Sequence, residues 1–179
     1  MTLVDSAPVR MILERLGGRR LSIVKNAGNI LLFGFGEHLE VDTEHTSPEF
    51  GLHVQCPWRI ENTEQGRIVT GSSDFYVPAP DNHDETWKPT NGSGSLQKYR
   101  MLELLHGANS PIRSNRNTSG QLRVASAELL PYFGLSINLS PSYLLSVFPD
   151  GTADEGWRLI DSGPPSTHYV LKDSRLQVE

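Results

Sequence analysis

Residues 51–60 carry the most regular apolar alternation in the chain, and this alternation limits the possible folds more than any other feature. The segment reads GLHVQCPWRI, with apolar side chains at the even positions and mostly polar ones between them. A repeat of two residues is the period of a β-strand with one buried face. We therefore expect a central strand whose even face lies in the core, with Trp58 as its largest side chain.

Apolar runs separated by turn-rich tetrads predict antiparallel hairpins around this strand. The predicted hairpins pair 21–25 with 30–35, 50–61 with 67–77, and 135–139 with 143–148. A bulge is expected at 71–73, where the parity of the apolar positions changes. Further strands are predicted at 122–129, 155–160 and 167–171.

Two segments have helical rather than strand periodicity. Val9, Ile12, Leu13 and Leu16 recur at helical spacing between Pro8 and the glycine pair at 17–18. Residues 95–107 contain good helix formers between a serine able to cap and a terminating glycine, with Leu102 and Leu105 expected to face inward. The expected fold is α+β and mainly antiparallel, a curved sheet or flattened barrel of hairpins with two helices.

Size and charge limit the class of protein. A chain of 179 residues with 37% hydrophobic composition fits a single domain over 1–179, with mobile loops expected at 78–94 and 107–121. The net charge of −5 disfavours a nucleic-acid partner. No secretion signal and no long apolar stretch is evident, so we expect no membrane association. A single cysteine fits a reducing compartment, and we expect a cytoplasmic location.

Metal and cofactor chemistry find little support in the sequence. His53 and Cys56 have a spacing that suggests metal ligands, but on a regular strand they point to opposite faces. Four polar residues share one face of a predicted strand: His38, Glu40, Asp42 and Glu44. Neighbours on such a face lie two rises of about 3.3 Å apart, a spacing typical of a solvated face rather than of ligands that share one cation. We expect neither a metal nor a cofactor.

Nucleophilic catalysis is also unsupported. There is no Gly-x-Ser-x-Gly elbow and no phosphate-binding glycine loop. Cys56 has the parity of the buried face, so it is interpreted as a small core side chain. Charge is more informative, because residues 26–58 contain five acids and no Lys or Arg, whereas basic residues dominate 98–123. Such charge asymmetry steers encounters with a charged partner, although ordinary solvated loops and strand faces give the same pattern.

The predicted binding residues are Trp87, His53, Tyr76, His106, Arg113 and Arg116. A pocket, if present, is expected to use His53, Cys56, Tyr76 and His106. Trp87 lies in the long polar loop 78–94 and has two interpretations. It either folds back over the sheet edge or core, or it faces outward as an aromatic anchor for a partner.

Two stretches carry a resemblance. The segment 139–160, with VFPDG and EGWRL, resembles the C-terminal part of small uncharacterised bacterial cytosolic proteins, and LHVQCPWRI at 52–60 is similar to another stretch of such proteins. Some of these proteins are suspected immunity or accessory partners, and no catalytic motif comes with the resemblance.

The expected function is therefore a non-enzymatic protein-interaction or immunity-like module, acting on a protein partner or by self-association. The alternative is a small-molecule-binding protein or enzyme with a pocket between sheet and helices. These differ in whether titratable groups converge within hydrogen-bond reach of one another.

Overall fold

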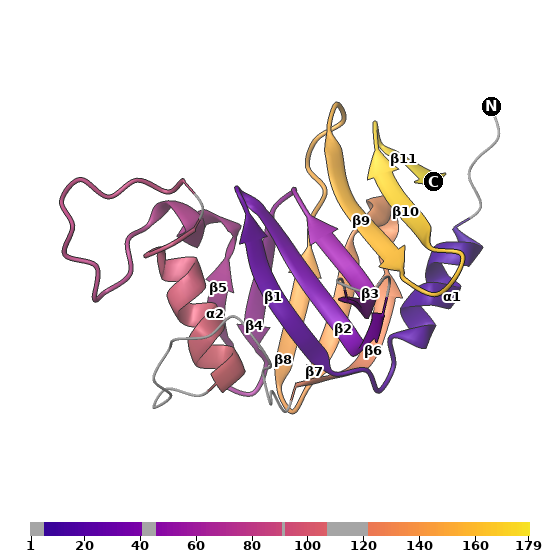
Figure 1. Cartoon of the computed structure of the whole chain (residues 1–179), viewed down its shortest axis with the longest axis horizontal. Helices are drawn as coiled ribbons and strands as arrows, with labels where there is room; N and C mark the ends of the chain where they lie inside the picture. The colour runs from indigo at the N-terminus through magenta and orange to yellow at the C-terminus, as the bar shows by residue number, and fades with distance from the viewer. Residues whose placement is uncertain (1–5, 41–45, 91, 107–121) are drawn as a thin grey trace.

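The structure, a computed structural model, describes residues 6–40, 46–90, 92–106 and 122–179, and in this part of the chain antiparallel strands form two sheets (Figure 1). The six-stranded sheet has the order β1-β2-β3-β9-β10-β11, and the five-stranded sheet has the order β5-β4-β8-β7-β6. The strands of the first sheet are β1 (Leu21–Ala27), β2 (Ile30–Glu40), β3 (Thr46–Val54), β9 (Glu155–Asp161), β10 (Thr167–Lys172) and β11 (Arg175–Val178). The strands of the second sheet are β4 (Trp58–Asn62), β5 (Arg67–Gly71), β6 (Arg123–Leu129), β7 (Leu135–Ser140) and β8 (Tyr143–Val147).

The helices lie at opposite ends of this pair of sheets (Figure 1). The two α-helices are α1 (Ala7–Arg15), which packs against β6, and α2 (Leu96–His106), which packs against β5. Two short 3₁₀ helices are η1 (Ser72–Tyr76) and η2 (Pro131–Phe133). The α+β class with two helices and mainly antiparallel strands is therefore confirmed, and the sheets do not close into a barrel.

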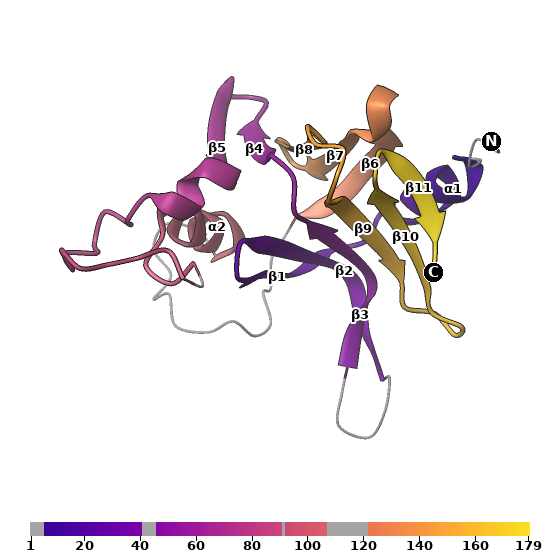
Figure 2. The same ribbon diagram turned by 90° about the horizontal axis from the view of Figure 1, so that it is seen from above.

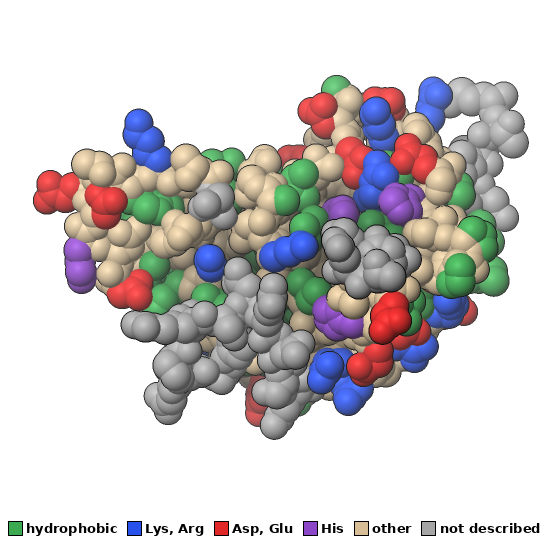
Figure 3. Space-filling model, viewed as in Figure 1, with side chains coloured by type: hydrophobic (Ala, Val, Ile, Leu, Met, Phe, Trp, Pro, Cys, Tyr) green, Lys and Arg blue, Asp and Glu red, His purple; other side chains and the backbone are tan. Residues whose placement is uncertain are grey.

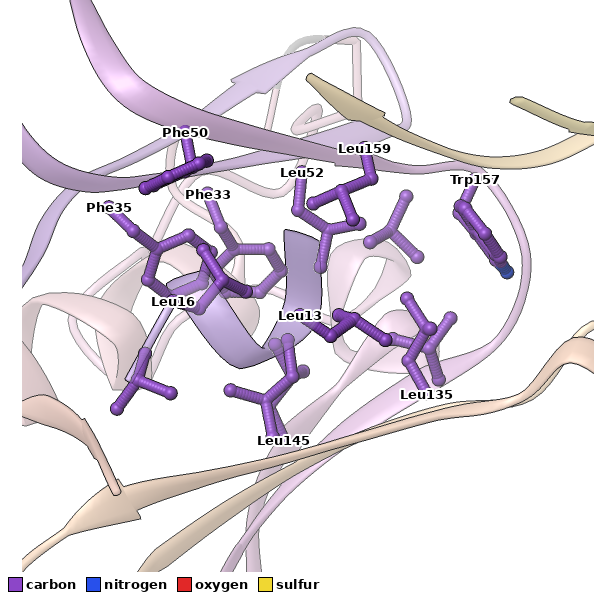
Figure 4. Packing of buried hydrophobic residues seen from close by; sticks show 14 of the residues in the cluster. Leu13, Leu16, Phe33, Phe35, Phe50, Leu52, Leu135, Leu145, Trp157 and Leu159 are labelled. Atoms are coloured by element: carbon purple, nitrogen blue, oxygen red, sulfur yellow. The ribbon is translucent and has the colours of Figure 1, made fainter. Parts of the chain in front are cut away.

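The core lies between the two sheets, and α1 fills one end of it. Leu13 and Leu16 of α1 are almost fully buried. Figure 4 shows them between the aromatic side chains of β2 and β3 on one side and Leu135 and Leu145 on the other. The helical spacing of the apolar residues in 9–16 is explained by this position, because a helix between two sheets buries a wide apolar face.

The prediction of one continuous strand through residues 51–60 is wrong. β3 ends at Val54 in the six-stranded sheet, and β4 begins at Trp58 in the five-stranded sheet. Between them the chain crosses from sheet to sheet, with the amides of Gln55 and Cys56 donating to the Gly156 carbonyl at 2.9 and 3.1 Å. The alternation is uninterrupted because the inner faces of both strands line the same core.

The prediction of a strand through residues 72–77 is also wrong. The hairpin partner β5 ends at Gly71, where η1 begins. Asp74 favours this turn, because one of its carboxylate oxygens accepts from the Thr70 hydroxyl at 2.9 Å and from the Gly71 amide at 3.2 Å. The predicted hairpins that correspond to β1–β2 and β7–β8 are confirmed.

Sequence reasoning missed β11. This strand follows a two-residue turn at Asp173 and Ser174, both with positive φ (52° and 56°). Such a turn normally carries glycine or asparagine, so a strong hairpin signal is missing at these two residues. The predicted mobile loop at 107–121 lies outside the described residues.

Candidate binding groove

A groove crosses the outer face of the six-stranded sheet and encloses a cavity of about 390 Å³. One row of cross-strand neighbours runs along it, each residue paired with the next: Ile23, Gly34, Gly51, Ile160 and His168, from β1, β2, β3, β9 and β10. Two adjacent glycines lower the middle of this row between two isoleucines. We name these five residues the glycine row.

A second row borders the groove, and its members Lys25, Leu32 and His53 line the cavity as one wall. Lys25, Leu32, His53 and Arg158 are successive cross-strand neighbours, two residues along each strand from the glycine row. Their side chains share the outer face because residues two apart on a strand point the same way. Five strands set about 4.8 Å apart give the groove a length of roughly 19 Å.

The end of the β2–β3 hairpin supplies the opposite wall, with Thr46, Ser47 and Pro48 lining the cavity. Figure 2 shows this hairpin bending away from the second sheet. The bend coincides with a register shift between Phe35 and His38, and Gly36 within it has φ +85°. A Cβ on Gly36 would lie 2.7 Å from the Cβ of Glu49, so only glycine fits there without rearrangement.

Two arginines, one at the end of α1 and one in the segment after it, bind carboxylates on strands that border the groove. Arg19 donates from Nε and Nη2 to one carboxylate oxygen of Glu49 on β3, at 3.0 and 2.8 Å. Arg15 forms an ion pair with Asp161 on β9. The Ser162 amide also donates to the Glu49 carbonyl at 3.0 Å, so β3 and β9 are tied together beside the groove.

Arg158 is the centre of a charged network at the β9–β10 side of the groove. Its guanidinium donates to both carboxylate oxygens of Glu155 (3.1 and 2.8 Å), and it forms an ion pair with Glu179 at 3.0 Å. Nη1 of Arg158 also lies 3.0 Å from Nδ1 of His168. Figure 3 shows histidine, basic and acidic side chains gathered on this face over β9 and β10.

The contact between Arg158 and His168 fixes the histidine tautomer. A guanidinium can only donate, so Nδ1 of His168 must accept and the ring proton resides on Nε2. The Arg158 hydrogen bonds hold the pKa of the Glu155 carboxyl below its usual range. His168 therefore offers an N–H donor from its other ring nitrogen, and Glu155 stays charged.

His53 lies in the wall row and is half-buried. Burial is the main cause that lowers its pKa, and the neighbouring Arg158 guanidinium lowers it further. A neutral imidazole in the middle of the groove, beside Leu32 and the two glycines, makes this part of the surface mostly apolar. The arrangement has an apolar floor with a few polar groups at its edges, which is typical of ligand sites.

The hydrogen bonds of the groove histidines bear on nucleophilic catalysis, in which a base accepts from the nucleophile. Within the described ranges, no hydroxyl or thiol donates a hydrogen bond to His53 or His168. Cys56 lies away from the groove, beside a small hollow formed by the 149–156 loop, and burial raises the pKa of its thiol to about 12. No group of three His, Cys, Asp or Glu residues that could hold a metal ion occurs in the part of the chain that the structure describes.

Among the predicted binding residues whose side chains the structure describes, His53 alone lines the groove. Tyr76 is exposed at the end of η1. Trp87 is half-buried within its own loop, and its indole N–H donates to the Ser93 carbonyl at 2.7 Å. The side chain of His106, together with Arg113 and Arg116, lies outside the described residues.

The residues that sequence reasoning missed are Gly34, Gly51, Ile160, His168 and Arg158. Each was placed in or near a predicted strand, but none carries a motif. Gly34 and Gly51 meet where β2 pairs with β3. The other three join them because β9 lies between β3 and β10, a strand order that alternation does not reveal.

A second exposed feature lies at the far end of the five-stranded sheet. Tyr132 in η2 is 91% exposed, and both Tyr132 and Phe133 have positive φ (58° and 62°). The indole N–H of the buried Trp157 donates to the Phe133 carbonyl at 2.8 Å, which holds this strained turn in place.

Comparison with known proteins gives no relative: no family model matches the chain, and neither the curated proteins nor the solved structures contain a significant match. None of the helices in the described ranges has the length and apolar character needed to cross a membrane.

Proposed function

We propose that this protein is a non-enzymatic protein-interaction module that binds an extended segment of a partner in the outer groove. The observation that carries the proposal is the glycine row, which forms a groove across five strands instead of a compact pocket. An extended chain advances about 3.3 Å per residue, so roughly six residues match the length of about 19 Å. An immunity-like or accessory role is consistent with such a module.

The chemistry of the groove supports binding rather than turnover. Its floor offers contact area between Ile23 and Ile160, and its edges offer hydroxyl groups and the Nε2–H donor of His168. Backbone amides and carbonyls of an extended segment need such partners when they leave water. Arg158, next to His53 at the border of the groove, is already held by two carboxylates, which suits a fixed recognition surface.

A selection from a random peptide library displayed on phage tests this proposal. The wild-type protein should enrich peptides with a shared sequence, with dissociation constants on the order of micromolar, as weak interfaces show. The decisive variant is Gly51→Val, which fills the middle of the groove. A Cβ at Gly51 would meet Ile160 at 3.5 Å, an ordinary contact, so the fold should tolerate Gly51→Ala, and thermal melting checks that Gly51→Val is folded as well.

The matched control is Gly151→Val, because a Cβ at Gly151 meets nothing within 4 Å. Enriched peptides should bind Gly51→Val at least about tenfold more weakly than the control, with Gly51→Ala giving a smaller loss. Circular dichroism and thermal melting confirm that each variant is folded. Equal binding to Gly51→Val and to the wild type, or no enrichment at all, would refute the proposal.

A small-molecule function remains the second candidate, because a second hollow of about 270 Å³ lies between β1 and α2 and shares Lys25 with the outer groove. Lys25, Lys98, Met101 and Leu105 are among its lining residues. A ligand there would stabilise the folded protein in a thermal-shift screen of metabolites. Strong stabilisation by a metabolite, together with no peptide enrichment, would favour this candidate.

A further inference from the structure

We propose that the segment bound in the outer groove carries an acidic residue at one end and a basic residue at the other, with apolar residues between them. This inference rests on the proposed function and specifies the chemistry of the partner. It follows from charges of opposite sign at the two ends of the groove.

The β1 end of the groove is positive. Lys25 is exposed, lines the groove and begins the wall row. In the described part of the chain, no carboxylate lies within ion-pair distance of its ammonium group. A carboxylate on the partner can therefore approach Lys25 without displacing an existing ion pair.

The β10 end has an excess of negative charge. Glu179 lies next to His168, the last residue of the glycine row. Each of these two residues donates its amide to the carbonyl of the other, at 3.0 and 2.9 Å. Glu155 and Glu179 share the single guanidinium of Arg158, and the Glu179 side chain is 49% exposed. Two carboxylates against one guanidinium leave this end able to attract a cation.

The middle of the groove favours apolar side chains. Gly34 and Gly51 leave space between Ile23 and Ile160, and the wall beside them consists of Leu32 and the His53 imidazole with its lowered pKa. A charged partner side chain at this position would lose water without gaining a partner of opposite charge. The order of chemistry along the groove is thus positive, apolar and negative.

Four short peptides test this order. Each has the sequence X-Ser-Val-Ser-Val-Ser-Z with blocked ends, where X and Z are Glu and Lys, Glu and Glu, Lys and Lys, or Gln and Gln. Seven residues in an extended chain span roughly 20 Å, close to the groove length. Binding of dye-labelled peptides is measured by fluorescence anisotropy at low salt, where ion pairs at a surface are least screened.

The peptide with Glu and Lys should bind the wild type about threefold or more tighter than the other three, as expected from two partly exposed ion pairs. Lys25→Glu should reverse the preference, so that the peptide with two lysines binds best. Lys88→Glu makes the same charge change in an exposed loop residue and should leave the preference unchanged.

The outcomes separate this inference from the proposed function. Equal affinity for all four peptides, or a Lys25→Glu variant with the wild-type preference, would overturn the charge order. If these peptides fail to bind while library-selected peptides bind and are lost in Gly51→Val, the charge order is wrong and the groove function stands. If neither kind of peptide binds, both proposals fall.

Discussion

The two histidines of the groove have different surroundings, although only β9 separates their strands. His168 accepts from Arg158, so its tautomer is fixed by a partner that can only donate. Burial is the largest cause that lowers the pKa of His53. One histidine thus supplies a directed donor, and the other supplies an uncharged surface.

Protonation of His53 should destabilise the folded protein. Its folded-state pKa lies below the ordinary value of 6.5, so the unfolded chain takes up the proton first as the pH falls. The free energy of unfolding should therefore decline below about pH 6.5, until the folded-state imidazole is protonated too. In the variant His53→Gln this part of the decline should be missing, as measured by urea unfolding between about pH 5 and 7.5.

The groups that face His53 support this assignment. Arg158 and Lys25 oppose its protonation, as does His168, whereas Glu155 favours it, and Leu32 of β2 is uncharged. The interactions of the Glu155 carboxylate are lost in a separate pH window, below the ordinary pKa of 4.5 for this group. His83→Gln makes the same substitution at an exposed loop position and serves as the control variant. An unaltered slope in His53→Gln would contradict the assignment.

The Cys56 thiol should be almost inert in the folded protein. Burial raises its pKa from 9.0 to about 12, which lowers the thiolate fraction near pH 8 by roughly a thousandfold. Reaction with a disulfide reagent such as Ellman's reagent should be at least about a hundredfold slower in buffer than in urea. Comparable rates in the two conditions would show that the thiol is exposed and ionisable.

At the scale of elements, the wall formed by the β2–β3 hairpin depends on the bend at Gly36. An alanine there must adopt a positive φ, and its Cβ would overlap Glu49, which is held by Arg19. Gly28 also has a positive φ (61°), but a Cβ there meets nothing within 4 Å. Gly28→Ala should cost about 1 kcal/mol of unfolding free energy and Gly36→Ala at least about 1 kcal/mol more, measured by chemical denaturation. Equal costs would mean that the bend is not constrained.

Trp87 packs within its own loop, residues 78–94, and not in the core between the sheets. The indole N–H bonds to Ser93 at 2.7 Å, and the ring is absent from the main cluster of buried side chains. Trp87→Ala should lower the free energy of unfolding by about 1 kcal/mol, below the roughly 3–5 kcal/mol of a core tryptophan, and increase proteolysis within the loop. Trp157→Ala serves as the core comparison, and equal losses from both variants would show that Trp87 stabilises the whole domain.

Local sequence signals predicted most elements, because helix periodicity and hairpin turns depend on neighbours in the chain. Residues 9–16 and the pair 135–139 and 143–148 are examples. Local signals failed where tertiary context decided the outcome. Residues 51–60 keep one alternation across two strands, and β11 follows a turn without glycine.

At the scale of the whole molecule, the candidate site depends on strand order, which explains why the sequence did not predict it. Gly51 and Ile160 are far apart in the chain, and they become neighbours only when β9 pairs with β3. His53 was singled out because of its residue type, whereas glycines in strands carry no chemical signal of their own. The glycine row is therefore a property of the folded sheet.

The central claim is that the outer groove, and not another surface, binds the partner segment. The most direct test is to titrate a library-selected peptide into isotopically labelled protein and follow the backbone amide signals by NMR. We predict that the largest shifts occur at Gly34, Gly51 and Ile160 and that Gly51→Val abolishes them, because these residues form the floor. Shifts centred on the exposed Tyr132 turn, with the groove signals unchanged, would contradict the claim.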